Sequence, residues 1–336
     1  MANENSPLLP RLEESAALLQ QQQHKKKEII GLLLMALSAF AFSLMSLFVK
    51  ISGSKFPSFE IVFARSSIQC LLGLVGCAYF KVNPLGDKKL RGLLAFRGLI
   101  GAMGLAFFFY SITQLPLPDA TVLFFLNPLF TAILAAIFLG EAFTIFDMLC
   151  SACCVVGIIL VSKPEFLFGG HSPSSPHDDN GSDLLSDKDN ALSRVLGISA
   201  ALVGALLAAI AYVTVRKIGK NVHFMVHVVY FGFVSTVFSI LGMIFFQKPV
   251  MPTSSDSIPL LLVGLTAFLG QCLLNKSLQL AAAGKATLVR MNDVFFAFLL
   301  SITVLHEVPD IYSTIGSLII VLATTSLGLH RWLIQK

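Results

Sequence analysis

Long apolar runs alternate with short polar segments along almost the whole chain. Each run is close to the roughly 20 residues that a helix needs to cross the hydrocarbon core of a bilayer. Strands of a membrane barrel would be shorter and would alternate more strictly between apolar and polar positions. The pattern therefore predicts ten transmembrane helices, at roughly 29–50, 58–80, 92–113, 119–140, 146–162, 195–215, 224–246, 258–280, 286–305 and 311–332.

Two polar segments lie outside these runs. Residues 1–28 are polar and low in complexity, and we expect them to form a disordered cytoplasmic tail. Residues 163–193 are rich in Ser, Asp, Gly and Pro, and we expect a disordered linker on the lumenal or extracellular side. Two blocks of five predicted helices remain, residues 29–162 and 194–333.

The two blocks align on each other without a gap at an offset of 166 residues. The offset superimposes four pairs of glycines: Gly31 on Gly197, Gly76 on Gly242, Gly98 on Gly264 and Gly104 on Gly270. Because five helices are an odd number, the second block must start from the opposite side of the membrane, which makes an inverted repeat. We therefore predict an all-α integral membrane protein of about ten transmembrane helices in two inverted five-helix repeats. Alternating-access transporters have this architecture, with a binding site near the midplane.

Composition supports a membrane protein. Charged residues make up 13% of the chain, the mean hydropathy is +0.80, and a soluble domain would carry about 25% charged residues. The net charge of +5 comes from short basic clusters between the runs, which fits membrane orientation better than nucleic-acid binding. With the N-terminus inside, the inner segments hold fourteen Lys and Arg residues and the outer segments six. We therefore expect both termini to be cytoplasmic.

Several short motifs occur in a fixed order within the ten-run pattern. They are Ser46-Leu-Phe-Val-Lys50, Asp119-Ala-Thr-Val, Leu139-Gly-Glu141, Lys276-Ser-Leu-Gln279 and Met291-Asn-Asp-Val-Phe-Phe-Ala-Phe298. With these motifs, residues 29–333 resemble the EamA-repeat group of the drug/metabolite transporter superfamily, and are most similar to the G branch of solute carrier family 35. The resemblance implies a metabolite carrier whose cavity is lined by the first four helices of each repeat. It leaves the substrate open, because members carry chemically diverse solutes.

Charged residues inside the runs are the first candidates for a substrate site. Four are basic, namely Arg65, Arg97, Lys276 and Arg290, and the one acid well inside a run is Asp293. A charge at the centre of a membrane helix costs about 2.5–3.5 kcal/mol on insertion scales. Cations lining an aqueous cavity would bind an anionic substrate. The alternative is that they snorkel to the interface or pair structurally.

Two short polar residues are repeat mates. Asp293 lies 166 positions after Asn127, and Pro128 disturbs the helix next to Asn127. A disturbed helix at membrane depth is tolerated where it lines a cavity or is buried in protein. We therefore add Asn127 to the candidate substrate site. Asp293 is three residues from Arg290, so it has either a local ion-pairing role or a role in substrate positioning or proton relay.

Two acid–base pairs are candidate gates at the ends of the runs. The topology places Glu307 with Lys50 outside and Glu141 with Arg216 inside, and the alternative is that all four are interfacial anchors. His223, His227, His306 and His330 fall at run ends and are also expected at the interface.

Two further signals concern location. Asn180-Gly-Ser182 is an N-glycosylation sequon in the predicted lumenal linker. Residues Glu4 to Leu9 have the spacing of an acidic di-leucine signal that a sorting adaptor would bind. They favour an endosomal, lysosomal or vacuolar membrane, with the plasma membrane as the alternative.

The function that fits best is a carrier that moves a small organic anion, a carboxylate or phosphorylated metabolite, by alternating access. One alternative is a proton-coupled exporter of neutral or amphipathic metabolites. Another is a non-transporting regulator that acts through a protein partner. We expect no enzyme activity, cofactor or metal, because the runs hold no nucleophile elbow, acid–histidine cluster or metal-ligand spacing. A homodimer is compatible with this architecture.

Overall fold

The computed structural model describes residues 8–52, 55–115, 117–163, 183–246, 250, 257–306 and 311–333. Glu307, Asn180 and residues 4–7 of the sorting signal lie outside these ranges.

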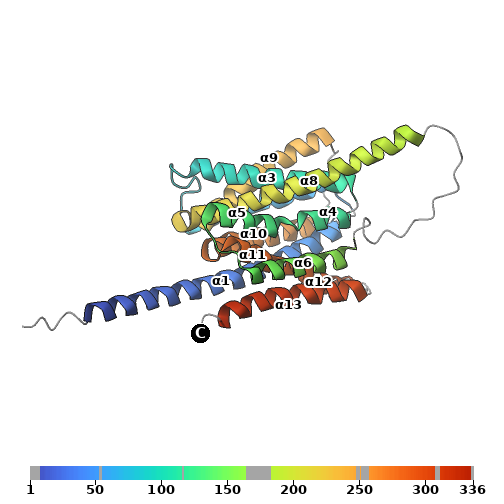
Figure 1. Cartoon of the computed structure of the whole chain (residues 1–336). Helices are drawn as coiled ribbons and strands as arrows, with labels where there is room; N and C mark the ends of the chain where they lie inside the picture. The colour runs from blue at the N-terminus through green and yellow to red at the C-terminus, as the bar shows by residue number, and fades with distance from the viewer. Residues whose placement is uncertain are drawn as a thin grey trace, which may run out of the picture.

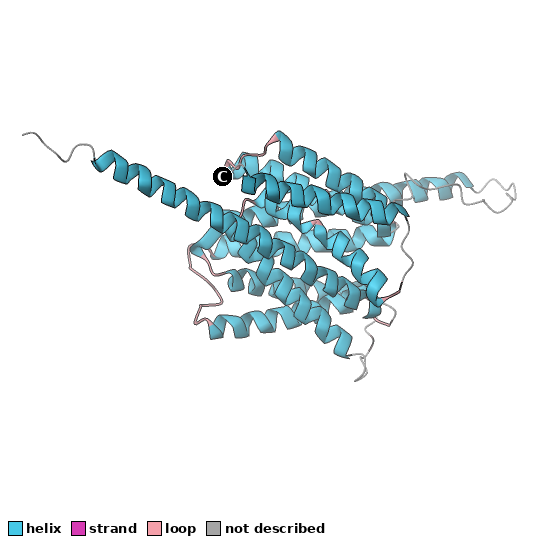
Figure 2. Cartoon of the chain, turned by 90° about the horizontal axis from the view of Figure 1, so that it is seen from below, coloured by secondary structure: helices cyan, strands magenta, loops and turns pink. Residues whose placement is uncertain are grey.

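Within the described ranges the protein is a bundle of helices (Figure 1, Figure 2). The helices are α1 (Leu8–Ser52), α2 (Ser58–Tyr79), α3 (Arg91–Gln114), α4 (Leu117–Phe124), α5 (Asn127–Leu139), α6 (Ile145–Ser162), α8 (Asp183–Ile218), α9 (Phe224–Phe246), α10 (Ser257–Leu280), α11 (Ala283–Arg290), α12 (Asn292–Val304) and α13 (Ile311–Leu333). A short 3₁₀ turn, Gly219–Asn221, follows α8.

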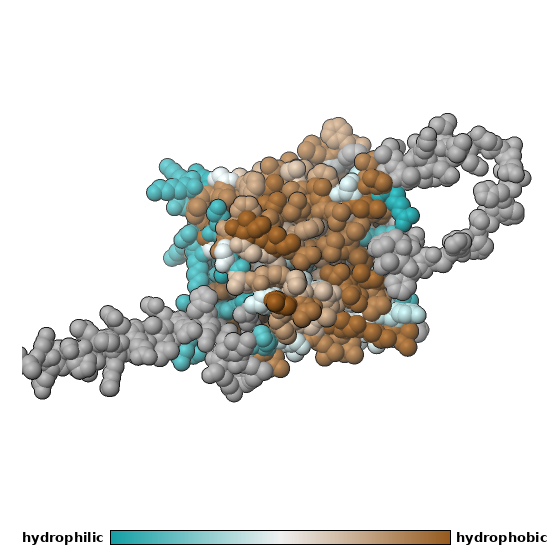
Figure 3. All heavy atoms as spheres, viewed as in Figure 1, coloured by the Kyte–Doolittle hydropathy of each residue, from teal (hydrophilic) through white to brown (hydrophobic). Residues whose placement is uncertain are grey.

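The bundle has the dimensions and surface of a membrane domain. Among the described residues, ten helical segments are long and apolar enough to cross a membrane, with α4 and α5 forming one span and α11 and α12 another. Figure 3 shows an apolar band between two polar rims. The predicted fold of about ten transmembrane helices is confirmed.

Two helices extend into segments that we expected to be disordered. α1 begins at Leu8 and projects well beyond the bundle, and α8 begins at Asp183 (Figure 1). The structure therefore differs from the prediction over Leu8–Glu28 and Asp183–Ser193. Leu, Glu, Gln, Ala and Lys are frequent in the first of these stretches, and all five are strong helix formers.

The internal repeat is visible in the helix bounds. Adding 166 to the bounds of α3 gives those of α10, and adding 166 to the bounds of α4 gives those of α11. The packing is repeated as well: α1 lies along α10 and α8 along α3, while α2 packs on α9 and α6 on α13. Each repeat therefore packs mainly against the other.

The first glycine pair of the offset occupies equivalent close contacts. A Cβ atom built on Gly31 would lie 2.7 Å from the Cβ of Ala281, and one on Gly197 would lie 2.7 Å from the Cγ of Leu115. Ala281 and Leu115 are themselves 166 positions apart. Because a side chain at either glycine would push the helices apart, these matches reflect packing between the repeats.

Both repeats break their fourth span near the middle. The turn Phe125–Leu126 separates α4 from α5, and Met291 separates α11 from α12. Pro128 stands at the start of α5, so the predicted disturbance of the helix beside Asn127 is confirmed. The second break occurs without a proline.

An asparagine stabilises each break. The side-chain amide of Asn127 donates to the carbonyl of Phe124 at 2.9 Å, and that of Asn292 donates to the carbonyl of Val289 at 2.9 Å. By this contact the counterpart of Asn127 is Asn292, although the offset pairs Asn127 with Asp293. The shift of one residue arises because the first break spans two residues and the second spans one.

Candidate substrate site

Arg97 lies on α3 and is 2% exposed. Its Nη2 donates to Oδ1 of Asn275 at 3.2 Å, and its Nη1 donates to the carbonyl of His227 at 3.4 Å. The guanidinium carbon lies 4.9 Å from the ring centroid of Phe231. All these partners are uncharged, so they fix the guanidinium in place without neutralising it.

Arg290 and Arg65 meet at Tyr212. Arg290, the last residue of α11, donates from Nη1 to the hydroxyl of Tyr212 on α8 and stacks over the ring of Phe42 at 4.7 Å. Arg65 on α2 is 9% exposed and lies close enough to Arg290 and Tyr212 to interact electrostatically with both. Tyr212 interacts in the same way with Arg97. We call Arg65, Arg97, Arg290 and Tyr212 the arginine cluster.

The arginine cluster has unused hydrogen-bonding capacity. The Nε atoms of Arg65, Arg97 and Arg290 are buried and have no partner among the described residues. No ion pair to an acid is formed by any of these arginines in the described part of the chain. Buried charges without a counter-charge are costly, so the cluster is electrostatically prepared for an anion.

Asp293 lies near the arginine cluster but does not pair with Arg290. The Ser43 hydroxyl donates to the Asp293 carbonyl at 2.9 Å and lies 3.1 Å from its Oδ1. Within the described residues no ion pair joins Asp293 to Arg290, so the local ion pair inferred from their spacing is wrong for this structure. The reason is the turn at Met291: three-residue spacing brings side chains together only along a continuous helix.

Lys276 and Asn127 occupy other places. The Nζ of Lys276 lies 5.5 Å from the ring of Phe224, beside His223, near one end of the bundle. Burial, and then the charge of Lys276, hold the pKa of His223 below its usual range. Asn127 is 4% exposed and holds the break between α4 and α5. Of the six predicted substrate-binding residues, the structure therefore brings together the three arginines, with Asp293 close by.

Tyr212, Asn275 and His227 were missed by the sequence reasoning. His227 was expected at the interface, yet its side chain is fully buried, and neither ring nitrogen has a partner among the described residues. It lies in the first turn of α9, where α9 packs between α2, α3 and α10. Position near a helix end indicates the interface only when neighbouring helices leave that end uncovered. Tyr212 and Asn275 are uncharged, so a search for embedded charge passes over them.

One end of the bundle is closed by two ion pairs. Arg216 Nε lies 2.6 Å from Glu141 Oε1, and the other oxygen of Glu141 accepts the backbone N–H of Ala283 at 2.7 Å. Lys285 Nζ lies 2.9 Å from Glu28 Oε1. We call this end of the bundle the Glu141 end. The expected contact between Glu141 and Arg216 is present, whereas the Lys50–Glu307 pair falls outside the description because Glu307 does.

The comparison with known sequences decides the family. A sequence model of the EamA-like transporter family matches residues 29–163 and 195–329, once for each repeat. The chain belongs to the EamA-like transporter family. As the motifs indicated, this EamA-like protein is a multi-pass membrane transporter related to solute carrier family 35.

Curated relatives support the same assignment. The EamA-like protein is 32% identical over 306 residues to mouse solute carrier family 35 member G1, covering 90% of this chain and 79% of the mouse protein. It is 30% identical to the pseudopaline exporter CntI of Pseudomonas aeruginosa, covering 89% of this chain and 95% of the exporter. One crystal structure superimposes with a TM-score of 0.72 at 18% identity, covering 90% of this chain and 98% of that one, which supports the fold alone.

Proposed function

We propose that this EamA-like protein carries a small organic anion, a carboxylate or a phosphorylated metabolite, by alternating access. The observation that supports this proposal is the arginine cluster. Arg65 and Arg97 are buried and Arg290 is partly buried, and all three interact with Tyr212 while their Nε donors stay unused. Among the described residues, Asp293 is the acid that lies near them. A cluster with this charge attracts anions and repels cations.

Two properties of the cluster favour an anion over a structural role. A scaffold would gain nothing from three cations inside the spans, each of which costs free energy in a membrane. The cluster also draws its members from α2, α3, α8 and α11, which belong to different repeats. An anion bound there would hold both repeats at once, as a midplane site between inverted repeats requires.

The contacts at the Glu141 end support alternating access. Glu141 belongs to the first repeat, whereas Arg216 and Ala283 belong to the second, and Lys285 of the second repeat holds Glu28 at the start of the first. Opening this end would break these contacts, so they stabilise the closed state. We infer that they act as the gate on this side.

The direct test is counterflow in proteoliposomes that contain the full chain. Labelled monocarboxylates, dicarboxylates, sugar phosphates, neutral sugars and an organic cation are supplied one at a time. We expect exchange of at least one anion class and none of the cation. Exchange confined to neutral solutes or cations would contradict the proposal.

A proton-coupled exporter is the second candidate, because a relative at 30% identity is named as an exporter. A substitution of Asp293 distinguishes the anion carrier from the proton-coupled exporter, since Asp293 is the described acid that lies nearest the arginine cluster. In an anion carrier without proton coupling, Asp293→Asn removes the negative charge beside Arg290 and tightens anion binding at every pH. In a proton-coupled exporter, it abolishes accumulation driven by a pH gradient but leaves exchange intact. Ser43→Ala is the matched control, because it removes the hydrogen bond to Asp293 and keeps the charge.

A further inference from the structure

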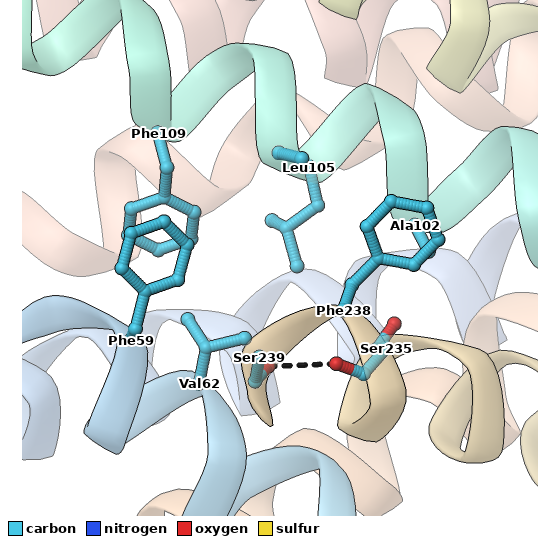
Figure 4. Close-up of a pocket in the computed structure, with 9 residues that line it drawn as sticks. Phe59, Val62, Ala102, Leu105, Phe109, Ser235, Phe238 and Ser239 are labelled. Carbon is cyan, nitrogen blue, oxygen red and sulfur yellow. Dashed lines mark hydrogen bonds between the residues drawn. The ribbon is translucent and has the colours of Figure 1, made fainter. Parts of the chain in front are cut away.

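A small cavity lies between α2, α3 and α9. Its volume is about 30 Å³. Figure 4 shows Phe59 and Val62 of α2 facing Leu105 and Phe109 of α3, with Ser235 and Phe238 of α9 at the third side. The lining is almost entirely apolar. A volume of roughly 10–15 Å³ holds one group the size of a water or a methylene, so this cavity has room for two or three.

The cavity is a direct neighbour of the arginine cluster. On α2, Val62 precedes Arg65 by three residues and therefore shares its face. On α9, Ser235 follows Phe231 by four residues, and the Phe231 ring lies against Arg97. Val62 and Ser235 thus lie about one helical turn from Arg65 and Phe231, on the side away from the Glu141 end.

The wall of the cavity contains one incomplete polar contact. Ser235 is 1% exposed, and its hydroxyl has no hydrogen-bond partner among the described residues. The neighbouring Ser239 hydroxyl, by contrast, donates to the carbonyl of Ser235 at 2.7 Å. A buried hydroxyl without a partner costs free energy, and an alkyl group beside it would leave it unpaired, so this hydroxyl marks free space at the α9 wall and does not by itself select the ligand.

We propose that this cavity is a subsite for the short carbon chain of the anion bound by the arginine cluster. The proposal rests on the proposed function. It narrows the substrate class to organic acids with a short alkyl portion next to the acidic group. The charge lies among the guanidinium groups, and two or three carbons extend along the apolar side chains of Val62, Leu105 and Phe238. A longer chain gains nothing further, because the cavity is then full.

The test compares straight-chain carboxylates on the full chain in proteoliposomes. Half-maximal inhibition of labelled butyrate binding is measured for acetate, propionate, butyrate, valerate and hexanoate. Burying one methylene supplies roughly a three- to fourfold gain in affinity, so valerate should bind roughly 30- to 60-fold more tightly than acetate. Hexanoate should match valerate.

Filling the cavity with a larger side chain should remove the gain in affinity from acetate to valerate. In Ser235→Leu we expect the valerate-to-acetate ratio to fall to about one, and Ala106→Leu, on the opposite wall, should do the same if Ser235→Leu folds poorly. The matched control is Ser199→Leu on the exposed face of α8, which should keep the ratio of the parent protein.

The outcomes separate the two proposals. If no carboxylate of any length binds the parent protein, the proposed function fails and the subsite fails with it. If carboxylates bind but show no gain with chain length, the subsite alone is overturned. The subsite is also overturned if both filled variants keep the ratio, which would be the result if a lipid chain occupies the cavity.

Discussion

Arg97 keeps its full charge available for a ligand. Its neighbours are an amide oxygen, a backbone carbonyl and an aromatic ring, so each orients the guanidinium and none cancels it. Arg290 is oriented in the same manner by Tyr212 and Phe42. The side chains that position the charge are therefore neutral residues from both repeats.

At the residue scale we predict that Arg97→Gln weakens anion binding roughly ten- to hundredfold. Losing one charge-assisted contact of this kind costs about 1–3 kcal/mol. The measurement is the half-maximal concentration for uptake of the anion found by counterflow, in variants with the same elution profile in detergent. Lys276→Gln is the control, because it removes an equal charge outside the cluster. An Arg97→Gln protein with unchanged uptake would return Arg97 to a structural role.

The positions of the helices were the part of this structure that the sequence predicted best. The span pattern and the 166-residue offset follow from sequence, because each repeat buries the same faces against the other and the bounds of α10 reproduce those of α3. The break at Met291 could not be predicted in this way, since no proline or glycine marks it. For that reason the Arg290–Asp293 pairing was also misjudged. The arginines could be found from their embedded charge, whereas Tyr212 and Asn275 become visible only when α8 and α10 are packed.

At the element scale we predict that breaking the Glu141–Arg216 pair opens the Glu141 end. The pair is partly exposed, so the expected shift is about 1 kcal/mol, or roughly a fivefold change in the ratio of open to closed states. The reporter is thiol labelling at Ala135→Cys, a buried position beneath this end, in a chain without its native cysteines. Glu141→Gln and Arg216→Gln should each raise the labelling rate.

The charge swap is the stricter test of this gate. Glu141→Arg with Arg216→Glu restores the ion pair but not the contact between Glu141 and the N–H of Ala283. Labelling at position 135 should therefore return only part of the way to the parent rate. If neither single variant changes labelling, Glu141 and Arg216 are anchors and not a gate.

At the scale of the whole molecule, the charge asymmetry predicts its orientation. From fourteen basic residues on one side against six on the other we predict that both termini are cytoplasmic and that Asn180 is lumenal. In eukaryotic cells we expect a mobility shift after glycosidase treatment that is lost in Asn180→Gln. If a thiol reagent labelled Asn180→Cys from the cytosolic side in cells with a permeabilised plasma membrane, the predicted orientation would be wrong.

In an alternating-access cycle, equivalent positions of the two repeats should exchange their exposure to water, and these positions carry different residues in the two repeats. The offset of 166 relates the cavity residues Leu105, Phe109 and Ser235 to Gln271, Asn275 and Gln69. The first set lines the small cavity, and the second set is buried on the side of the Glu141 end. Leu105 and Phe109 are partly exposed, whereas Ser235 is as buried as Gln69. Gln69 Oε1, Gln271 Oε1 and Asn275 Nδ2 are buried and have no hydrogen-bond partner among the residues that the structure describes. Unpaired polar groups are costly in a permanently closed region but suit a surface that becomes wet in another state.

We therefore predict that positions related by the 166-residue offset change their accessibility to water in opposite directions. In a chain without its native cysteines, a small hydrophilic thiol reagent should label Leu105→Cys and Phe109→Cys more readily than Gln271→Cys and Asn275→Cys. Adding Glu141→Gln should raise the rates at positions 271 and 275 and lower those at 105 and 109. The opposite movement matters most, because general loosening of the bundle would raise all four rates together. A parallel rise would therefore exclude exchange between two inverted conformations, whereas a reciprocal change requires it.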